Sequence, residues 1–596
     1  MNIARPLQDR YGGIASSSQG GGCVMTLRDV YQLAIFLILL AALTKPCGVY
    51  LEAVFEDRDH LFKRPLHWIK WLERIIYKFC RLEPTEEQHW STYSIHLLVF
   101  SAFSVAFNYV ILRLQHVLPL NPQHLGPLSP HLSFNVAMGF ITGTAWTSYS
   151  SESAVSYFSQ MVGLTFQNFM SPATGLCAAV ALIRGLSRKE SSGIGNFWAD
   201  LVRANLYVLL PICFLFSIFL ISQGVIQNFL PYQWMITLEG GRQLIAMGPA
   251  ASQIAIKLFG SNGEGFFNAN AAHPFENPTA LSNFIQMLSM FLIPSGLIYY
   301  LGRAVKNLRH AWSVWIAMAI LFVSGVFICA HYEYQGNPVY TKLGASSSEN
   351  WEGKEVRFGI FNSALFSVIS TDTSTGAVNA MQDSFTPLGG LVPLVNMKLG
   401  EVVFGGVGAG LYGIVAIILL TIFIAGLMVG RTPEYLGKKI GGREIKYVML
   451  ATIAFPVVVL VFAAWASLDP RGLSGLGNPG AHGFTEILYA YTSGGANNGS
   501  SFGGLSTNTP FWNLTLAFVM FFGRFFTMIP MLAVAGSMAK KRVTPAGVGT
   551  FPAEGLIFVG LLISVILVVG ALTFFPALVL GPITEHFDMI QWHWFR

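Results

Sequence analysis

The chain has 596 residues, of which 53% are hydrophobic and 11% are charged. Soluble domains carry about 25% charged residues on average, so this composition excludes an ordinary soluble protein and indicates a membrane protein. The formal net charge of +6 is spread along the chain without a contiguous basic segment. That distribution argues against a nucleic-acid partner and leaves membrane lipid as the expected surroundings.

The first 24 residues are polar and rich in Gly and Ser. They lack the apolar core of a signal peptide, so two interpretations stay open. Residues 1–24 are either a disordered leader or the result of a start site placed too early, with Met25 as the alternative initiator. The six cysteines are scattered and form no CxxC pair, so neither a zinc site nor a disulfide framework is expected.

Ten apolar runs are long enough to cross a bilayer, which requires about 20 residues. We expect membrane-spanning helices over residues 31–52, 93–113, 161–184, 204–223, 279–301, 311–331, 403–430, 447–466, 512–536 and 555–579. Four shorter apolar segments, which end in Gly, Ser, Thr and Asn, lie at residues 131–141, 248–259, 358–370 and 481–491. Their length is typical of re-entrant half-helices.

Lys and Arg accumulate in the loops that follow the first, third, fifth, seventh and ninth spans, whereas residues 114–147 contain neither. Short loops on the cytoplasmic side of a membrane are enriched in these residues. The pattern therefore predicts that both termini and all four half-helix segments face outward.

The half-helix segments repeat along the chain. Thr144, Gly263, Gly376 and Gly499 are separated by 119, 113 and 123 residues, which indicates four copies of a span, pore loop, span unit. The expected domains are a polar leader (1–24), a first helix with a basic cytoplasmic loop (25–90), four pore repeats (91–190, 191–309, 310–445 and 446–545) and a tenth helix with an outward C-terminus (546–596). The predicted fold class is an all-α membrane protein with pseudo-fourfold, potassium-channel-like symmetry and two peripheral helices.

A short polar sequence follows each half-helix: Thr142-Gly-Thr-Ala-Trp146, Ser261-Asn-Gly-Glu-Gly265, Thr373-Ser-Thr-Gly376 and Gly495-Ala-Asn-Asn-Gly499. Glycine permits the left-handed backbone that turns successive carbonyls to one side. A K⁺ ion needs such oxygens in place of its hydration shell, and four helix C-termini favour a cation. One such sequence alone is more often an ordinary turn, but four at constant spacing predict one selectivity filter.

Four acidic residues lie near these loops: Glu152, Glu264, Asp372 and Asp383. They either raise the local cation concentration at the mouth or are solvated loop charges. At the end of the second half-helix, Lys257 is expected to snorkel to the surface.

Arg524 lies inside the apolar run 521–526, where a charge needs a wet or paired interior. We favour a position below the filter, where its charge competes with the ion and pushes it onward. The alternative is a structural ion pair with an acidic residue.

The run Phe404–Gly413 is rich in glycine, including Gly405, Gly406 and Gly408. It opens a predicted span instead of following a βα unit, which argues against a dinucleotide site. A weak helix that unwinds beneath the filter suits a gate, and close helix packing is the alternative. The sequence contains no GxxxxGK(S/T) or DKTG segment, so a second chain would have to supply energy for active transport.

From about Met25 onward, the chain resembles the potassium-binding A subunit of the bacterial Kdp potassium-transporting ATPase. The resemblance is carried by Gly265-Phe-Phe-Asn-Ala-Asn270, His273-Pro-Phe-Glu-Asn-Pro278, Gly376-Ala-Val-Asn-Ala-Met381, Gly400-Glu-Val-Val-Phe-Gly-Gly406 and Asn497-Asn-Gly-Ser500. It implies a fold of the potassium-channel and Trk/Ktr superfamily in the bacterial inner membrane. It also implies K⁺ as the transported ion and no nucleotide bound by this non-catalytic chain. The implied partners are the P-type ATPase B subunit, the C subunit and the small F subunit of the Kdp complex.

The resemblance also implies roles for single residues. The filter backbone would come from Thr142, Gly143, Thr144, Ala145, Ser261, Asn262, Gly263, Ser374, Thr375, Gly376, Asn497, Asn498 and Gly499. Translocation and gating would involve Arg524 and the glycine run after Glu401, with Gly405, Gly406 and Gly408. The chain departs from well-known members in the residues between Thr142 and Thr147, at Glu264 where a glycine is common, and at Thr375 where a cysteine is common.

We therefore expect a subunit that binds extracytoplasmic K⁺ and passes it towards the cytoplasm within an ATP-driven, high-affinity uptake pump. The main alternative is a Trk/Ktr-like channel or symporter that acts without a P-type partner. An intramembrane enzyme with outward acids and bases is disfavoured, because those residues lie in separate loops without a nucleophile motif.

Overall fold

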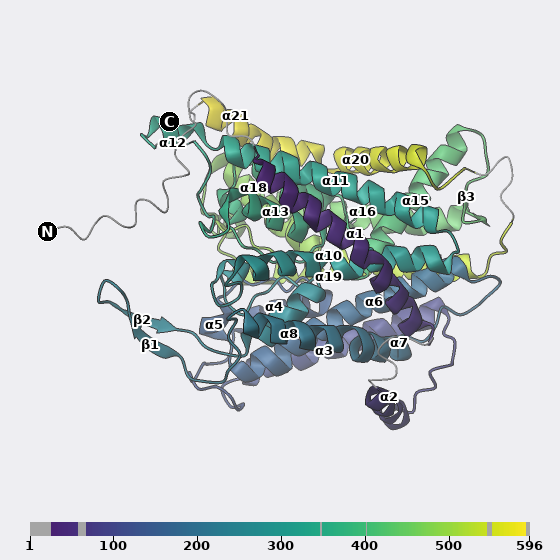
Figure 1. Cartoon of the computed structure of the whole chain (residues 1–596), viewed down its shortest axis with the longest axis horizontal. Helices are drawn as coiled ribbons and strands as arrows, with labels where there is room; N and C mark the ends of the chain where they lie inside the picture. Colours follow the sequence, from purple (N-terminus) through teal and green to yellow (C-terminus); the bar gives the residue numbers. More distant parts are fainter. Residues whose placement is uncertain (1–24, 58–66, 346–347, 401, 545–550, 592–596) are drawn as a thin grey trace.

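The computed structural model describes residues 25–57, 67–345, 348–400, 402–544 and 551–591 and is mostly helical (Figure 1). The predicted leader, residues 1–24, lies outside this part. Two small antiparallel sheets join β1 (Gln233–Ile236) to β2 (Arg242–Ile245) and β3 (Glu434–Tyr435) to β4 (Lys438–Lys439). Ten helices among the described residues are long and apolar enough to cross a membrane, which confirms the predicted number of spans.

Twelve spanning and half-spanning segments form four units, each with a long helix, a short helix and a second span. The first unit contains α3 (Trp90–Leu114), α4 (Pro130–Thr142) and η2 (Ser159–Thr165) running into α6 (Phe166–Ser187). The second contains α7 (Phe197–Arg203), η3 (Ala204–Leu209) and α8 (Leu210–Ser222) in series, then α9 (Ala250–Phe259) and α10 (Ala280–Ala304). The third contains α11 (Leu308–Gln335), α13 (Gly359–Asp372), α14 (Pro387–Lys398) and α15 (Ala409–Met428), and the fourth α16 (Gly442–Leu468), α18 (Gly480–Gly495) and α19 (Pro510–Ala539).

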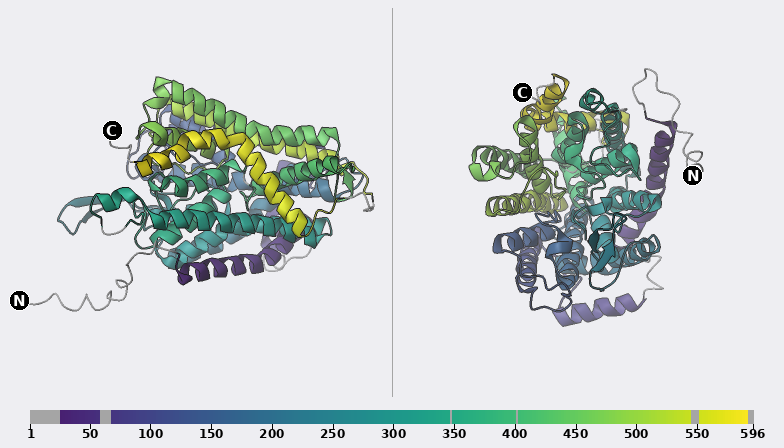
Figure 2. Two further views of the ribbon diagram at one scale, coloured as in Figure 1. Left: turned by 90° about the horizontal axis from the view of Figure 1, so that it is seen from above. Right: turned by 90° about the vertical axis from the view of Figure 1, so that its left-hand side faces the viewer.

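The four units surround one axis in sequence order, as the right-hand view of Figure 2 shows. Helix α1 (Leu27–Phe55) packs outside them on α10, and α20 (Leu556–Leu578) packs on α11 and α15, so both are peripheral as predicted. Helix α20 continues through η6 (Val579–Ile583) into α21 (Thr584–Gln591). The remaining short elements are α2 (His67–Cys80), α5 (Ser151–Ala154), η4 (Asn270–Ala272), α12 (Pro338–Lys342), η5 (Gln382–Ser384) and α17 (Pro470–Leu473).

Burial separates an inner ring of helices from an outer one. The second span of each unit, namely α6, α10, α15 or α19, is mostly buried, whereas α3 and α16 expose apolar side chains such as Phe103 and Val457. Apolar side chains on an outward helix face are stable in lipid, so this arrangement requires a bilayer around the bundle. The protein is therefore a multi-pass membrane protein. The four half-helices α4, α9, α13 and α18 match the short segments predicted from the sequence.

The second span of the third unit differs from its three counterparts because it is broken in the middle. Helix α15 begins only at Ala409, and the described residues between α14 and α15 form turns, with left-handed backbone at Phe404 (φ 46°) and Gly408 (φ 91°). A Cβ atom at Gly408 would overlap the carbonyl oxygen of Gly175 in α6. The prediction of a weak helix over the run Phe404–Gly413 is therefore wrong for residues 404–408, because this part of the run is already unwound against α6, and right from Ala409 onward. Glu401 lies outside the described residues.

A buried ion pair ties the first two units to α1 at the end of the bundle where α2 and β3 lie, opposite the β1–β2 hairpin (Figure 1). The Nη1 atom of Arg184 lies 2.7 Å from Oδ2 of Asp200. Arg184 also donates from Nη2 to the carbonyl oxygen of Phe55 over 3.0 Å, and the hydroxyl of Tyr93 donates to Asp200 over 3.0 Å. Four elements, α1, α3, α6 and α7, therefore meet at this ion pair.

We predict that Asp200→Ala lowers the free energy of unfolding by about 3 kcal/mol, because buried Arg184 loses its closest carboxylate and keeps only Glu56, whose Oε1 lies 3.4 Å from its Nε. The exposed pair of Glu190 and Arg542 provides the control, and Glu190→Ala should change stability by no more than about 1 kcal/mol. Thermal unfolding of the detergent-solubilised protein measures both. Equal effects of the two substitutions would contradict this role for the buried pair.

Candidate functional site

The backbone segments that follow the four half-helices converge on the axis of the bundle. A Cβ atom built on Gly376 would overlap the carbonyl oxygen of Asn498 and lie 2.6 Å from the Cα atom of Gly263. One built on Gly263 would lie 2.5 Å from the carbonyl oxygen of Thr144 and 2.8 Å from the Cα atom of Gly499. Each of the four units therefore contributes one strand of backbone to a single ring, at the positions predicted for the filter.

Each half-helix ends in the same way, with a left-handed residue that turns the chain into the ring. These residues are Gly143 (φ 80°), Ser261 (φ 51°), Ser374 (φ 48°) and Asn497 (φ 53°). After the last three, the amides of Asn262, Thr375 and Asn498 each donate over 2.9 Å to a carbonyl five residues earlier. This bond is characteristic of the Schellman helix end. Three segments thus share one local geometry, although their sequences differ.

Polar side chains brace the ring from behind. Asn497 donates from Nδ2 to Oγ1 of Thr144 over 2.9 Å, which links the fourth segment to the first. Asn498 donates to the carbonyl oxygen of Ser370 over 3.0 Å and links the fourth segment to the third. Within the third segment, the hydroxyls of Thr373 and Thr375 lie 2.5 Å apart. These contacts hold backbone strands that would otherwise repel one another through their carbonyl dipoles.

A small cavity lies beneath the ring. It is lined by Gly143, Ser261, Ser374 and Asn497, one residue from each segment, and on its other side by Gly406, Val407 and Arg524. The unwound segment that contains Gly405, Gly406 and Gly408 therefore lies directly below the ring, where the sequence predicted a gate.

Arg524 projects from α19 into this cavity and is only 6% exposed. Its Nη2 donates to the carbonyl oxygen of Ser171 over 3.1 Å, whereas its Nε finds no hydrogen-bond partner among the described residues. No carboxylate in the described part of the chain lies within ion-pair distance of it. The alternative of a structural ion pair therefore finds no support among these residues, and a fixed positive charge lines the cavity.

The sequence did not reveal a buried network behind the second segment. Lys257 is fully buried and pairs with Glu276, Nζ to Oε2, at 3.1 Å, so the prediction that it snorkels to the surface is wrong. Lys257 also contacts Oδ1 of Asn270, whose Nδ2 donates to the carbonyl oxygen of Gly263 over 2.9 Å. A half-helix lysine is thereby connected to the ring. One feature of the sequence pointed to this network: Asn270 and Glu276 belong to the motifs on which the family resemblance rests.

The four acidic residues near the loops are not a ring of solvated charges. Glu264 and Asp372 are 1% and 2% exposed. Burial raises the pKa of Glu264 to about 8. Glu152 is half-buried and accepts a hydrogen bond from the amide of Asn268 over 3.0 Å. The expectation of solvated loop charges is therefore wrong for Glu264 and Asp372.

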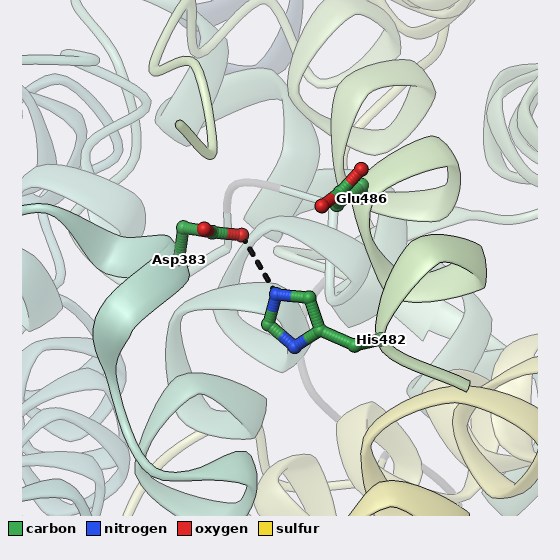
Figure 3. Close-up of side chains that lie close together, drawn as sticks. All are labelled: Asp383, His482 and Glu486. Carbon is green, nitrogen blue, oxygen red and sulfur yellow. Dashed lines mark hydrogen bonds and ion pairs between the residues drawn. The ribbon is translucent and has the colours of Figure 1, made fainter. Parts of the chain in front are cut away.

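Asp383, His482 and Glu486 form a cluster between the third and fourth units (Figure 3). His482 lies 2.9 Å from Asp383 through Nε2 and 2.7 Å from Glu585 of α21 through Nδ1. Burial alone would lower the pKa of His482, but the hydrogen bonds that its ring nitrogens donate to these two carboxylates raise it to about 10. The ligand atoms of Asp383, His482 and Glu486 lie within 4.8 Å of one another. Because both imidazole nitrogens of His482 already bind carboxylates, we interpret the cluster as a set of ion pairs that holds α18 against η5 and α21, and not as an open metal site.

Fold and site together define a class of protein: a pseudo-fourfold membrane protein whose four half-helices present one ring of backbone on the axis. The chain belongs to the family of potassium-transporting ATPase A subunits, whose model matches residues 34–587.

Relatives in this family are similar over almost the whole chain. Proteins described as potassium-transporting ATPase potassium-binding subunits from Nitratidesulfovibrio vulgaris and Methylobacterium nodulans are 55% and 54% identical. The first match covers 95% of this chain and 99% of the relative, and the second 94% and 98%. Among solved structures, the potassium transporter TrkH from Vibrio parahaemolyticus matches with a TM-score of 0.51 over 85% of this chain and 98% of that one. At 14% identity this likeness shows the fold alone, and it confirms the predicted fold class.

The ring predicts a sharp steric requirement at Gly376. We expect Gly376→Ala to weaken K⁺ binding at least about a hundredfold, or about 2.7 kcal/mol, because the added methyl group must displace the Asn498 carbonyl. Gly240 in the β1–β2 turn is the matched control, since it has a similar φ (83°) but nothing within 4 Å of its Cβ position. Calorimetric titration of both variants with K⁺ tests this. Normal binding by Gly376→Ala would contradict the convergence of the segments.

The network behind the ring predicts a stability effect. Lys257→Met leaves the carboxylate of Glu276 buried without its cation and should lower the free energy of unfolding by about 3–5 kcal/mol. The double variant Lys257→Met/Glu276→Gln removes both charges, so it should lose less than the sum of the two single variants. Unfolding measurements on all four proteins form the cycle. Additive losses would show that the two residues act independently.

Proposed function

We propose that this chain binds K⁺ at the ring formed by its four filter segments and passes the ion towards the cytoplasm as the ion-binding subunit of an ATP-driven uptake pump. The observation that carries the proposal is the convergence of backbone around Thr144, Gly263, Gly376 and Asn498. Backbone carbonyls in such a ring replace the hydration shell of a K⁺ ion. The names of the relatives, which are potassium-binding subunits of a potassium-transporting ATPase, support the same ion.

In this proposal, K⁺ enters from the side that carries the half-helix loops. The C-terminal ends of α4, α9, α13 and α18 meet at the ring, and their dipoles favour a cation there. Carbonyl oxygens of the thirteen predicted filter residues supply the site, while Thr and Asn side chains hold the backbone in place. Residues behind the ring, above all Asn270, keep the second segment in register with the others.

Below the ring, the ion meets the guanidinium of Arg524 and the unwound segment around Gly406 and Val407. Like charges repel strongly in a cavity of low dielectric. Arg524 therefore discourages a second ion from resting in the cavity and pushes the first one onward. The unwound segment, braced against Gly175, forms the barrier that must move for the ion to leave.

We further propose the orientation and the partners. The basic loops favour a cytoplasmic position for the end of the bundle that carries α2 and β3, which places both termini outside a bacterial inner membrane. Since the sequence has no nucleotide-binding loop, the energy has to come from the P-type B subunit, with the C subunit and the small F subunit completing the complex. The family name, which refers to one component of an ATPase, supports such an assembly.

ATP hydrolysis by the complex assembled with these three partners tests the proposal. We expect stimulation by low K⁺ concentrations and at least tenfold weaker stimulation by Na⁺. With Gly263→Ala the K⁺ stimulation should be lost while the complex still assembles, since the added Cβ crowds the Thr144 carbonyl at 2.5 Å.

Hydrolysis that is indifferent to K⁺ and to Gly263→Ala would contradict the proposed role. Sustained K⁺ flux into liposomes that contain this chain alone would instead favour an autonomous channel or symporter.

A further inference from the structure

Helix α2 lies outside the bundle and across the direction of its spans. Figure 1 shows it end-on beneath α7, and in the right-hand view of Figure 2, where the spans are seen end-on, it runs lengthwise along the lower edge of the bundle. Its inward face is held by Glu73, which is buried and accepts hydrogen bonds from the hydroxyls of Tyr77, over 2.8 Å, and Tyr207, over 2.7 Å. Arg203 adds an ion pair with Glu73 at 3.5 Å. The helix is therefore fixed to the first span of the second unit.

These contacts also set the depth of α2 in the bilayer. Arg203 and Tyr207 lie where the apolar run of residues 204–223 begins, which is the part of α7, η3 and α8 that crosses the membrane. The outward face of this span continues in exposed apolar side chains, among them Phe214 and Ile218. A helix that lies across the spans at this depth is placed at the boundary between acyl chains and headgroups.

A second face of α2 is apolar and is not covered by the described part of the chain. Trp71, Ile75 and Phe79 follow one another at intervals of four residues, so they share one side of the helix. Their exposed fractions are 64%, 41% and 88%. We call these three residues the apolar stripe. Aromatic side chains of this kind are favourable where acyl chains meet headgroups and unfavourable in water.

A third face of α2 is basic. Lys70, Arg74 and Lys78 have the same spacing, and each precedes one residue of the apolar stripe, so the two stripes lie side by side. None of these three basic residues has a carboxylate within ion-pair distance among the described residues. Glu73, the one acidic residue of α2, is used on the inward face. This basic stripe therefore carries three positive charges without a counter-ion in the described chain.

We propose that α2 is a binding site for anionic phospholipid, in which the apolar stripe lies among acyl chains and the basic stripe binds phosphate-bearing headgroups. Long basic side chains reach the headgroups from a helix at this depth. Each basic residue near an anionic membrane surface raises the affinity about fivefold. Lipid fits this surface better than a protein partner does, because the exposed apolar side chains of the adjoining span continue it into the bilayer. The site is separate from the ring and does not depend on the proposed K⁺ binding.

The test uses the protein with the subunits that accompany it in its own membrane, placed in lipid nanodiscs. Cys80, the last residue of α2, is exposed and carries a fluorophore in a variant whose other cysteines are replaced by serine. Nitroxide-labelled phosphatidylglycerol and phosphatidylcholine are compared as quenchers in a background of phosphatidylcholine. We expect phosphatidylglycerol to give the same quenching at a mole fraction at least about twentyfold lower, because three basic residues contribute.

Two matched double variants assign this preference to the basic stripe. Arg74→Gln/Lys78→Gln should lower the preference for phosphatidylglycerol at least about tenfold and leave quenching by phosphatidylcholine unchanged. Lys306→Gln/Arg309→Gln removes two exposed basic residues from the loop between α10 and α11, and should leave the preference as it is. An equal loss in both variants would overturn the proposed site.

Equal quenching by the two lipids in the unaltered α2 would also overturn it. Quenching that appears only after the accompanying subunits are removed would do the same, because a protein would then occupy α2. Hydrogen exchange keeps the proposal falsifiable if the labelled variant fails to fold, since it uses the unaltered protein. Relative to the rest of the chain, the amides of α2 should exchange at least about fivefold more slowly in nanodiscs with phosphatidylglycerol than in phosphatidylcholine alone, and equal rates would contradict the proposal.

Discussion

A K⁺ ion can lose its hydration shell only if protein oxygen atoms replace the water oxygens at a similar spacing. In this chain, four backbone segments that meet on the axis supply those oxygen atoms. That approach leaves no room for side chains at Gly263, Gly376 and Gly499. Backbone strands packed so closely need support, because their carbonyl dipoles repel when no ion lies between them. The remainder of the bundle supplies that support: half-helices that end in a common geometry, Thr and Asn side chains behind the strands, and inner spans that bury them all.

Buried charged residues also lie close to the ring. Lys257 and Glu276 form an ion pair behind the second segment, and Lys257 contacts Asn270, which donates a hydrogen bond to the carbonyl oxygen of Gly263. Arg524 lines the cavity beneath the ring and has no carboxylate within ion-pair distance among the described residues. In the proposed function, its positive charge repels a cation that enters this cavity.

Periodicity and composition were sufficient to predict the ten spans, the four half-helices and their pseudo-fourfold arrangement, because each depends on local hydrophobicity and on spacing. The break before Ala409 was not predictable from hydropathy, since apolar turns and apolar helix look alike until their packing against Gly175 is known. The prediction that Lys257 reaches the surface was wrong for a related reason. Its partner Glu276 lies in a separate loop, and only the folded chain brings the two together. The predicted filter positions converge as expected, but their role in holding K⁺ remains our proposal.

The most direct test of the central claim is to locate the ion. Diffraction from the protein in Rb⁺ or Tl⁺, recorded at wavelengths where these K⁺ substitutes scatter anomalously, shows where they bind. The account predicts a signal on the axis of the bundle, among the backbones of Thr144, Gly263, Gly376 and Asn498. Ions found only elsewhere, for instance among Asp383, His482 and Glu486, with none on the axis, would contradict it.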